Sequence, residues 1–169
     1  LVAARPVRVG AICRYDEAAQ PGWRPVGRVE SIGLRSTKIR KFDRTLITIP
    51  NAEFAQLHIQ NFGKCDRMLL STTLGLRYET SDDQLRFVLA ELRELLHAHP
   101  KTIHTVNDPI RVRFVAYGDY SLNVAIRVYV RSTDYSEFLA IQEDILLRMM
   151  KLVGQAGTGF AFPSRTLYI

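Results

Sequence analysis

The side chains best suited to bind a metal ion gather in one stretch of the sequence. His97, His99 and His104 lie close together, and Asp108 follows four residues later. Imidazole and carboxylate groups are common zinc ligands, but zinc sites favour tighter, helix-placed or cysteine-containing sets. His97 and His99 are two residues apart, so they diverge on a helix, and Pro100 ends that helix. We therefore expect a polar loop here and no metal site.

The sequence gives no more support for a catalytic site than for a metal site. Serine and threonine are common, but the sequence holds no G-x-S-x-G elbow, no P-loop and no G-x-G-x-x-G loop. The adjacent carboxylates Asp82 and Asp83 are better explained by a helix N-terminus, where negative charge is favourable. Met149 and Met150 lie on an apolar helical stripe and are expected in the core. We predict that the chain is not an enzyme and uses no cofactor.

The most unusual feature is the basic segment R-S-T-K-I-R-K-F-D-R at residues 35–44. Strand-like alternation would place its Arg and Lys residues on both faces of a strand. The whole chain is basic too, with 23 Lys and Arg against 17 Asp and Glu and a net charge of +6. Such charge suits nucleic acid, anionic lipid headgroups or an anion-attracting chamber about equally. A solvated strand edge is the simpler explanation of the same pattern.

Cysteine use and hydropathy set further bounds. Cys13 and Cys65 are far apart, so a disulfide scaffold is not expected and a reducing compartment fits better. No apolar run approaches the roughly 18 residues of a membrane-spanning helix. The chain starts at Leu1 without a methionine, and we interpret it as part of a longer protein. The lack of a span in this part therefore does not exclude a membrane protein.

The secondary structure expected to position these residues differs between the first part of the chain and the rest. The first part shows strand and turn signals only, with strands expected at residues 5–15, 24–34, 36–42 and 46–49. Gly10 marks a bend in the first of these. Asp43 and Arg44 predict a tight hairpin, because aspartate tolerates a left-handed backbone. The pattern is typical of a small all-β module whose short strands close on themselves or pair with neighbours.

Beyond Asn61, strands alternate with helices. The expected order is a strand at 68–78, a helix from Ser81, strands at 111–117 and 121–131, and a helix from Asp134 to Gly154. Ser81 and Gln84 match the capping box that opens a helix. The strand at 121–131 alternates apolar and polar residues, so one of its faces points to a core. This is the ferredoxin-like order, with both helices on one face of the sheet.

A ferredoxin-like module can bind RNA through aromatic side chains on its central strands. Here the open face of the strand at 121–131 offers only Tyr129, and no RNP-like motif is present. Nucleic acid is therefore not expected as a partner. The alternative function is nevertheless a soluble RNA-binding or ligand-sensing module, which a steep salt dependence of nucleic-acid affinity would favour.

One motif extends through the basic segment. It reads G-x-V-x-x-I-x-x-R-x-T-x-I, followed by L-I-T-I-P-N, and includes Gly27, Val29, Ile32, Arg35, Thr37, Pro50 and Asn51. The motif resembles the signature of the small-conductance mechanosensitive channel (MscS) family. R-P-V-R-V-G-A-I before it and F-A-F-P-S-R-T-L-Y-I at the end of the chain are similar to other stretches of that family. The resemblance therefore covers nearly the whole chain.

The resemblance implies an α+β fold in three parts: an Sm-like all-β domain at residues 1–63, a ferredoxin-like α/β domain at 64–159 and a barrel-forming strand at 160–169. The motif residues would serve structure and assembly, with Pro50 ending a strand and Asn51 capping the turn that follows. The residues alone leave the last strand without a partner in its own chain, so it must pair with copies of itself, pair with a neighbouring sheet or stay disordered. The resemblance implies that it joins copies of itself, through Phe160, Phe162, Pro163, Leu167 and Ile169.

The resemblance also implies a function. Members of the family are homoheptamers whose pore helices lead into a cage on the cytoplasmic side of the cell membrane. The pore opens under membrane tension and releases ions and small solutes during osmotic downshock. The implied partners are further copies of the chain, permeating ions and solutes, and membrane lipid through helices outside this part. The basic strands would then face water, outside the cage or inside its chamber.

Overall fold

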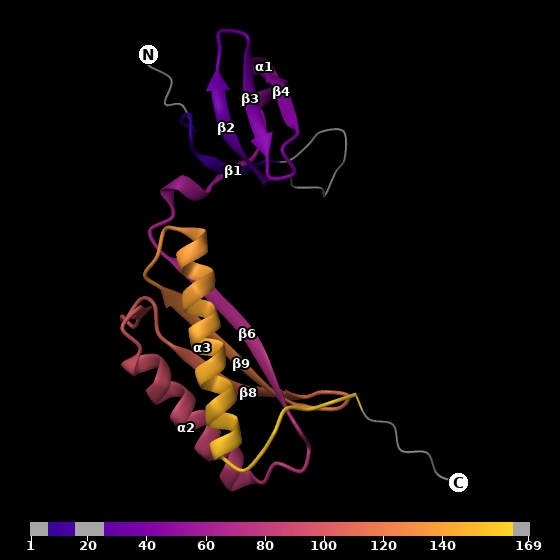
Figure 1. Cartoon of the computed structure of the whole chain (residues 1–169), viewed down its shortest axis with the longest axis vertical. Helices are drawn as coiled ribbons and strands as arrows, with labels where there is room; N and C mark the ends of the chain where they lie inside the picture. Colours follow the sequence, from indigo (N-terminus) through magenta and orange to yellow (C-terminus); the bar gives the residue numbers. More distant parts are fainter. Residues whose placement is uncertain (1–6, 16–25, 164–169) are drawn as a thin grey trace, which may run out of the picture. The chain divides into compact units, whose positions relative to one another are not determined.

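The computed structural model describes residues 7–15 and 26–163, and the chain divides into two compact units, Leu1–Cys65 and Asp66–Ile169. Each unit has its own sheet and its own hydrophobic core. The expected α+β class is confirmed, since the first unit is mainly strand and the second combines a sheet with two long helices (Figure 1).

Five short strands form the sheet of the first unit. They are β1 (Ile12–Tyr15), β2 (Val26–Ile32), β3 (Ser36–Lys41), β4 (Leu46–Pro50) and β5 (Ile59–Asn61), with the short helix α1 (Asn51–Phe54) after β4 and the 3-10 turn η1 (Phe62–Lys64) after β5. The sheet order is β4-β3-β2-β1-β5, with antiparallel neighbours. Alternate residues of these strands, among them Val29, Ile39 and Ile49, bury one face of the sheet. The three-residue strand β5 is too short for the sequence pattern to have shown it.

The β3–β4 hairpin turns where the sequence predicts, but a different residue has the left-handed backbone. Arg44 has a φ of 72°, and Asp43 does not, so that part of the expectation is wrong. The Asp43 carboxylate instead accepts hydrogen bonds from the N–H and the hydroxyl of Thr45, at 2.9 and 2.6 Å. These bonds stabilise a loop that begins as a tight turn and ends in one left-handed residue.

The second unit has the expected order of strands and helices. Its elements are β6 (Met68–Leu76), α2 (Asp82–Ala98), β7 (Thr102–Ile103), β8 (Arg111–Tyr117), β9 (Leu122–Val130) and α3 (Tyr135–Gln155). β9 is central and pairs antiparallel with β6, β7 and β8. Both helices lie on one face of the sheet (Figure 1). No helix in the described ranges combines the length and the apolar character needed to cross a membrane.

The core of the second unit lies between its sheet and its helices. The alternation predicted for β9 is confirmed, because Leu122, Val124, Ile126, Val128 and Val130 are all buried. They pack with apolar residues of α2 and α3, including Met149, which is 0% exposed. Met150 is 55% exposed, so its expected place in the core is wrong. One residue turns a helix by about 100°, which carries Met150 off the buried face.

Both long helices begin at the predicted caps. The Ser81 hydroxyl accepts a hydrogen bond from the Gln84 N–H at 3.2 Å, and the Gln84 side chain accepts one from the Ser81 N–H at 3.0 Å. Asp134 accepts a hydrogen bond from the Glu137 N–H at 2.8 Å. These contacts satisfy N–H groups that have no partner within the helix.

The start of the C-terminal segment contacts its own unit. Phe160 forms an isolated antiparallel bridge with Leu76, and the Ala161 N–H donates to the Gly75 carbonyl at 2.9 Å. The expectation that this segment has no partner in its own chain is therefore wrong for Phe160 and Ala161. The physical reason is that β6 pairs with β9 along one edge only, and its other edge accepts these bonds. Leu167 and Ile169 lie outside the described residues.

Candidate functional site

Several motif residues of the first unit meet at Asn51. Thr37, which is 1% exposed, donates its hydroxyl to Asn51 Oδ1 at 2.9 Å. Asn51 Nδ2 donates to the carbonyls of Gly33 and Leu34 at 2.9 and 3.1 Å. The Asn51 N–H donates to the Arg35 carbonyl at 2.9 Å. We call this set of contacts the Asn51 clamp, and it joins the β2–β3 turn to β3 and to the end of β4.

The clamp needs an asparagine, because one side chain must donate and accept at the same time. The residue before it is also placed as expected, since Pro50 is the last residue of the edge strand β4 and lacks an N–H. The expectation that Asn51 caps the following turn is wrong. Pro50 stands at the N-cap position of α1, and no side chain makes a capping bond there. The Asn51 side chain reaches back to the β2–β3 turn instead.

Gly27 lets β2 and β3 approach closely. A Cβ atom at this position would lie 2.5 Å from Ile39 Cγ2 and 3.0 Å from the Arg40 carbonyl oxygen. Val29 is buried beside it, and Ile32 packs against the same core. Arg35 contributes its carbonyl to the clamp while its side chain is exposed. The motif residues therefore act through packing and backbone contacts within this unit.

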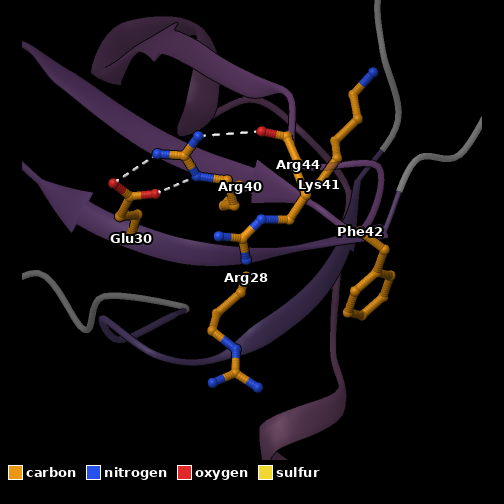
Figure 2. A pocket seen from close by; sticks show the side chains of 6 residues that line it. All are labelled: Arg28, Glu30, Arg40, Lys41, Phe42 and Arg44. Carbon is orange, nitrogen blue, oxygen red and sulfur yellow. Dashed lines mark hydrogen bonds and ion pairs between the residues drawn. The ribbon is translucent and has the colours of Figure 1, made fainter.

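The outward face of the same sheet is basic. Lys38 and Arg40 point outward from β3, while the inward positions Thr37 and Ile39 are buried. A pocket of about 580 Å³ opens on this face, and we call it the basic pocket. It is lined by Arg28, Glu30, Arg40, Lys41, Phe42 and Arg44 (Figure 2).

Glu30 and Arg40 form an ion pair in the lining of the basic pocket. β2 has an irregularity in its pairing between Val29 and Ser31, and such a bulge re-aims the residue within it. Glu30, at this point, accepts two hydrogen bonds from the Arg40 guanidinium, at 2.7 and 3.0 Å. The hydrogen bond with Arg40 lowers the pKa of Glu30 from its ordinary value. Both groups therefore stay charged at neutral pH.

The histidines that suggested a metal site are spread among different partners. The rings of His97 and His104 are 5.0 Å apart, edge to face. His99 is buried, with its Nε2 atom 3.1 Å from an Asp144 carboxylate oxygen. Asp108 pairs with an arginine. Within residues 7–15 and 26–163, no group of three His, Cys, Asp or Glu residues is placed to hold a metal ion.

Cys13 is a packing residue of the first unit. Its side chain is 0% exposed, and burial raises the pKa of its thiol to about 11. A thiol with so high a pKa is almost entirely protonated at neutral pH and is a poor nucleophile.

Two family models match the chain, one on each unit. The beta-domain of the mechanosensitive ion channel matches residues 1–64, and the C-terminal domain of the mechanosensitive ion channel MscS matches residues 70–160. An uncharacterized MscS family protein of Aquifex aeolicus is 42% identical over 165 residues, which are 98% of this chain and 42% of that protein. The low conductance mechanosensitive channel YnaI of Escherichia coli is 33% identical over 98% of this chain and 46% of its own length. The chain thus spans less than half of these relatives.

Solved structures share the fold. The closed state of Helicobacter pylori MscS matches with a TM-score of 0.77 and 21% identity, over 99% of this chain and 61% of that one. Arabidopsis thaliana MSL1 matches with a TM-score of 0.80 and 17% identity, over 94% of this chain and 54% of that one. With both units matched in order by the models of one family, the chain belongs to the MscS family of mechanosensitive ion channels.

Proposed function

We propose that this chain forms the cytoplasmic region of an ion channel that opens under membrane tension and releases ions and small solutes during osmotic downshock. The observation that carries the proposal is the match of two consecutive family models to two consecutive folded units. Relatives in Escherichia coli and Methanocaldococcus jannaschii, which are 33% and 38% identical, are named mechanosensitive channels. The channel would lie in the cell membrane, with this region on its cytoplasmic side.

The proposed assembly is a ring of identical copies, a homoheptamer. An apolar groove on the second unit supports self-association: its volume is about 510 Å³, and its apolar lining residues are Leu74, Leu139, Leu146, Leu147, Met150 and Phe160. Leu139, Leu147 and Met150 are 45%, 53% and 55% exposed. Covering such side chains with a second copy would be favourable, because it removes apolar surface from water.

The proposed role of each region follows the three parts expected from the sequence. Residues 1–63 would form the β domain, in which the Asn51 clamp keeps the strands in register. Residues 64–159 would form the α/β domain, and residues 160–169 would join the copies as a barrel. The 79% exposure of Phe162, directly before Pro163, supports the last assignment.

The test is to express the gene that encodes this chain in Escherichia coli cells that lack their own mechanosensitive channels. The proposal expects better survival of osmotic downshock and pressure-activated currents in membrane patches. Cells with an empty vector are the control. A gene product that reaches the membrane but gives neither rescue nor pressure-activated current would contradict the proposal.

A further inference from the structure

The basic pocket of the first unit is lined mainly by positive groups. Among the described residues, four basic side chains and one carboxylate line it, and one of the four, Lys41, has an interaction of its own. Arg28 and Arg40 are direct cross-strand partners on β2 and β3. Like charges directly opposite each other destabilise a sheet, and opposite charges nearby offset this repulsion. Glu30 supplies one negative group.

Arg40 is already committed to contacts within the chain. Its Nε and one terminal nitrogen donate to Glu30, at 2.7 and 3.0 Å, and its other terminal nitrogen donates to the Arg44 carbonyl at 3.1 Å. The last bond holds the hairpin at its left-handed residue, Arg44. Arg40 therefore orients the hairpin over the sheet and leaves little capacity for another anion.

The guanidinium groups of Arg28 and Arg44, unlike that of Arg40, make no hydrogen bonds within the described chain. In the part of the chain that the structure describes, neither side chain makes a hydrogen bond or a salt bridge, although the charge of Arg44 acts on Glu30 in addition to the hydrogen bond from Arg40. Both line the basic pocket; in Figure 2 the Arg44 guanidinium lies next to the Glu30–Arg40 pair, and the Arg28 side chain extends away from that pair. Two guanidinium groups that make no hydrogen bond, one on a strand and one on a hairpin that Arg40 braces, can donate to a negative group in the pocket.

The lining indicates the chemistry of the ligand. Guanidinium groups bind phosphate through two parallel hydrogen bonds, which a compact ammonium group does not offer. Phe42, which is 66% exposed, adds an apolar wall. A volume of about 580 Å³ is ample for a phosphate-bearing group of small-molecule size. We propose that the basic pocket binds an anion that carries phosphate groups, held by Arg28 and Arg44.

This inference is independent of channel activity, so it is tested on the purified chain by calorimetric titration with sodium pyrophosphate. The unchanged chain is expected to bind with one site per chain. The double variant R28Q/R44Q is expected to bind at least about tenfold more weakly, because charge-assisted hydrogen bonds are lost. The matched control R8Q/K64Q removes the same charge from exposed positions of the same unit that do not line the pocket, and its affinity is expected to stay within about twofold.

A second variant separates the effect of the planar guanidinium groups from the effect of their positive charge. R28K/R44K keeps both positive charges but removes the planar forks, and it is expected to bind several-fold more weakly than the unchanged chain. Far-UV circular dichroism of each variant confirms that it is folded. Should R28Q/R44Q fail to fold, R28K/R44K alone decides, and unchanged pyrophosphate affinity of that variant would overturn the proposal.

The phosphate could come from a soluble molecule or from a phospholipid headgroup, and a second arm distinguishes the two. The chain is sedimented with phosphatidylglycerol vesicles and with phosphatidylcholine vesicles. If the chain sediments with phosphatidylglycerol vesicles but not with phosphatidylcholine vesicles, and R28Q/R44Q abolishes this, the ligand is a lipid headgroup. If the chain binds pyrophosphate but sediments with neither kind of vesicle, the ligand is a soluble molecule. Absence of both pyrophosphate binding and vesicle retention, or equal weakening of binding by R8Q/K64Q, overturns the proposal.

Discussion

At the scale of the residue, the family motif is best understood through its contacts rather than through its charges. Asn51 makes three side-chain hydrogen bonds and Thr37 is buried beneath it. Gly27 has no room for a side chain. We expect these contacts to keep the strands of the first unit in register, and the expected roles of the motif in structure and assembly rest on that register.

Replacing Asn51 with alanine tests the clamp. Asn51→Ala would leave the buried Thr37 hydroxyl and two turn carbonyls without their partner, so we expect it to destabilise the first unit by about 2–3 kcal/mol. Urea unfolding measures the change. Asn107→Ala, at an exposed asparagine of the second unit, is the control and should change stability by less than about 0.5 kcal/mol. Equal effects of the two variants would show that the clamp contributes nothing.

Two glycine-to-alanine variants should change the stability of the protein in opposite directions. At Gly27 a Cβ would lie 2.5 Å from Ile39 Cγ2, so Gly27→Ala is expected to destabilise the protein by about 1–3 kcal/mol. Gly154 lies in α3, and a Cβ there meets nothing within 4 Å. Gly154→Ala is expected to stabilise the helix by up to about 1 kcal/mol. Thermal unfolding measures both, and a neutral Gly27→Ala would contradict the close approach of β2 and β3.

At the scale of the element, the first turn of helix α3 is stabilised by the hydrogen bonds of a titratable carboxylate, that of Glu137. Glu137 accepts hydrogen bonds from the Ser132 hydroxyl at 2.7 Å and from the Lys101 ammonium at 2.9 Å. These bonds, the one from Ser132 first, lower the pKa of Glu137 from its ordinary value of 4.5. The contact therefore connects the loop after α2, the loop after β9 and the first turn of α3.

This contact predicts a pH dependence. Because the folded pKa is lowered, the contribution of Glu137 is fully present above pH 4.5 and is lost as the pH falls through the lower folded value. Glu137→Gln should therefore flatten part of the fall in stability in acid. Glu143→Gln is the control, since Glu143 lies on the same helix and makes no hydrogen bond or ion pair within the described ranges. Identical acid unfolding curves for Glu137→Gln and the unchanged chain would refute the prediction.

At the scale of the whole molecule, the proposed ring requires surfaces through which copies of the chain contact one another. The apolar groove beside α3 and the exposed Phe162 are surfaces that one chain leaves uncovered. Phe160 and Ala161 are bound to β6 of their own unit, so a barrel-forming role would begin after them.

A truncation tests this role. Deleting residues 162–169 keeps the bonds of Phe160 and Ala161 to β6, so both units should stay folded with an unchanged far-UV circular dichroism signal. If the segment joins copies, the mass of the purified chain in solution should fall on truncation. Leu147→Asp with Met150→Asp probes the groove separately and should also lower the mass. An assembly of unchanged mass after truncation would show that the segment does not join the copies.

The sequence by itself determined the elements whose signals are local. The alternation in β9 and the caps and apolar spacing of α2 and α3 depend on residues at most a few positions apart, so each pattern is complete within its own element. The motif likewise indicated the family, because its residue types and their spacing are visible along the chain. The short strands β5 and β7 were not predicted, because runs of three and two residues hold no period.

Tertiary structure alone decided the contacts between distant residues. Asn51 reaches a turn 18 residues earlier, Glu30 meets Arg40 through an irregularity in strand register, and Phe160 bridges to Leu76. Such contacts depend on which strands pair and in what register. A one-residue shift of register would move each side chain to the other face, so spacing along the chain could predict neither the Asn51 clamp nor the basic pocket.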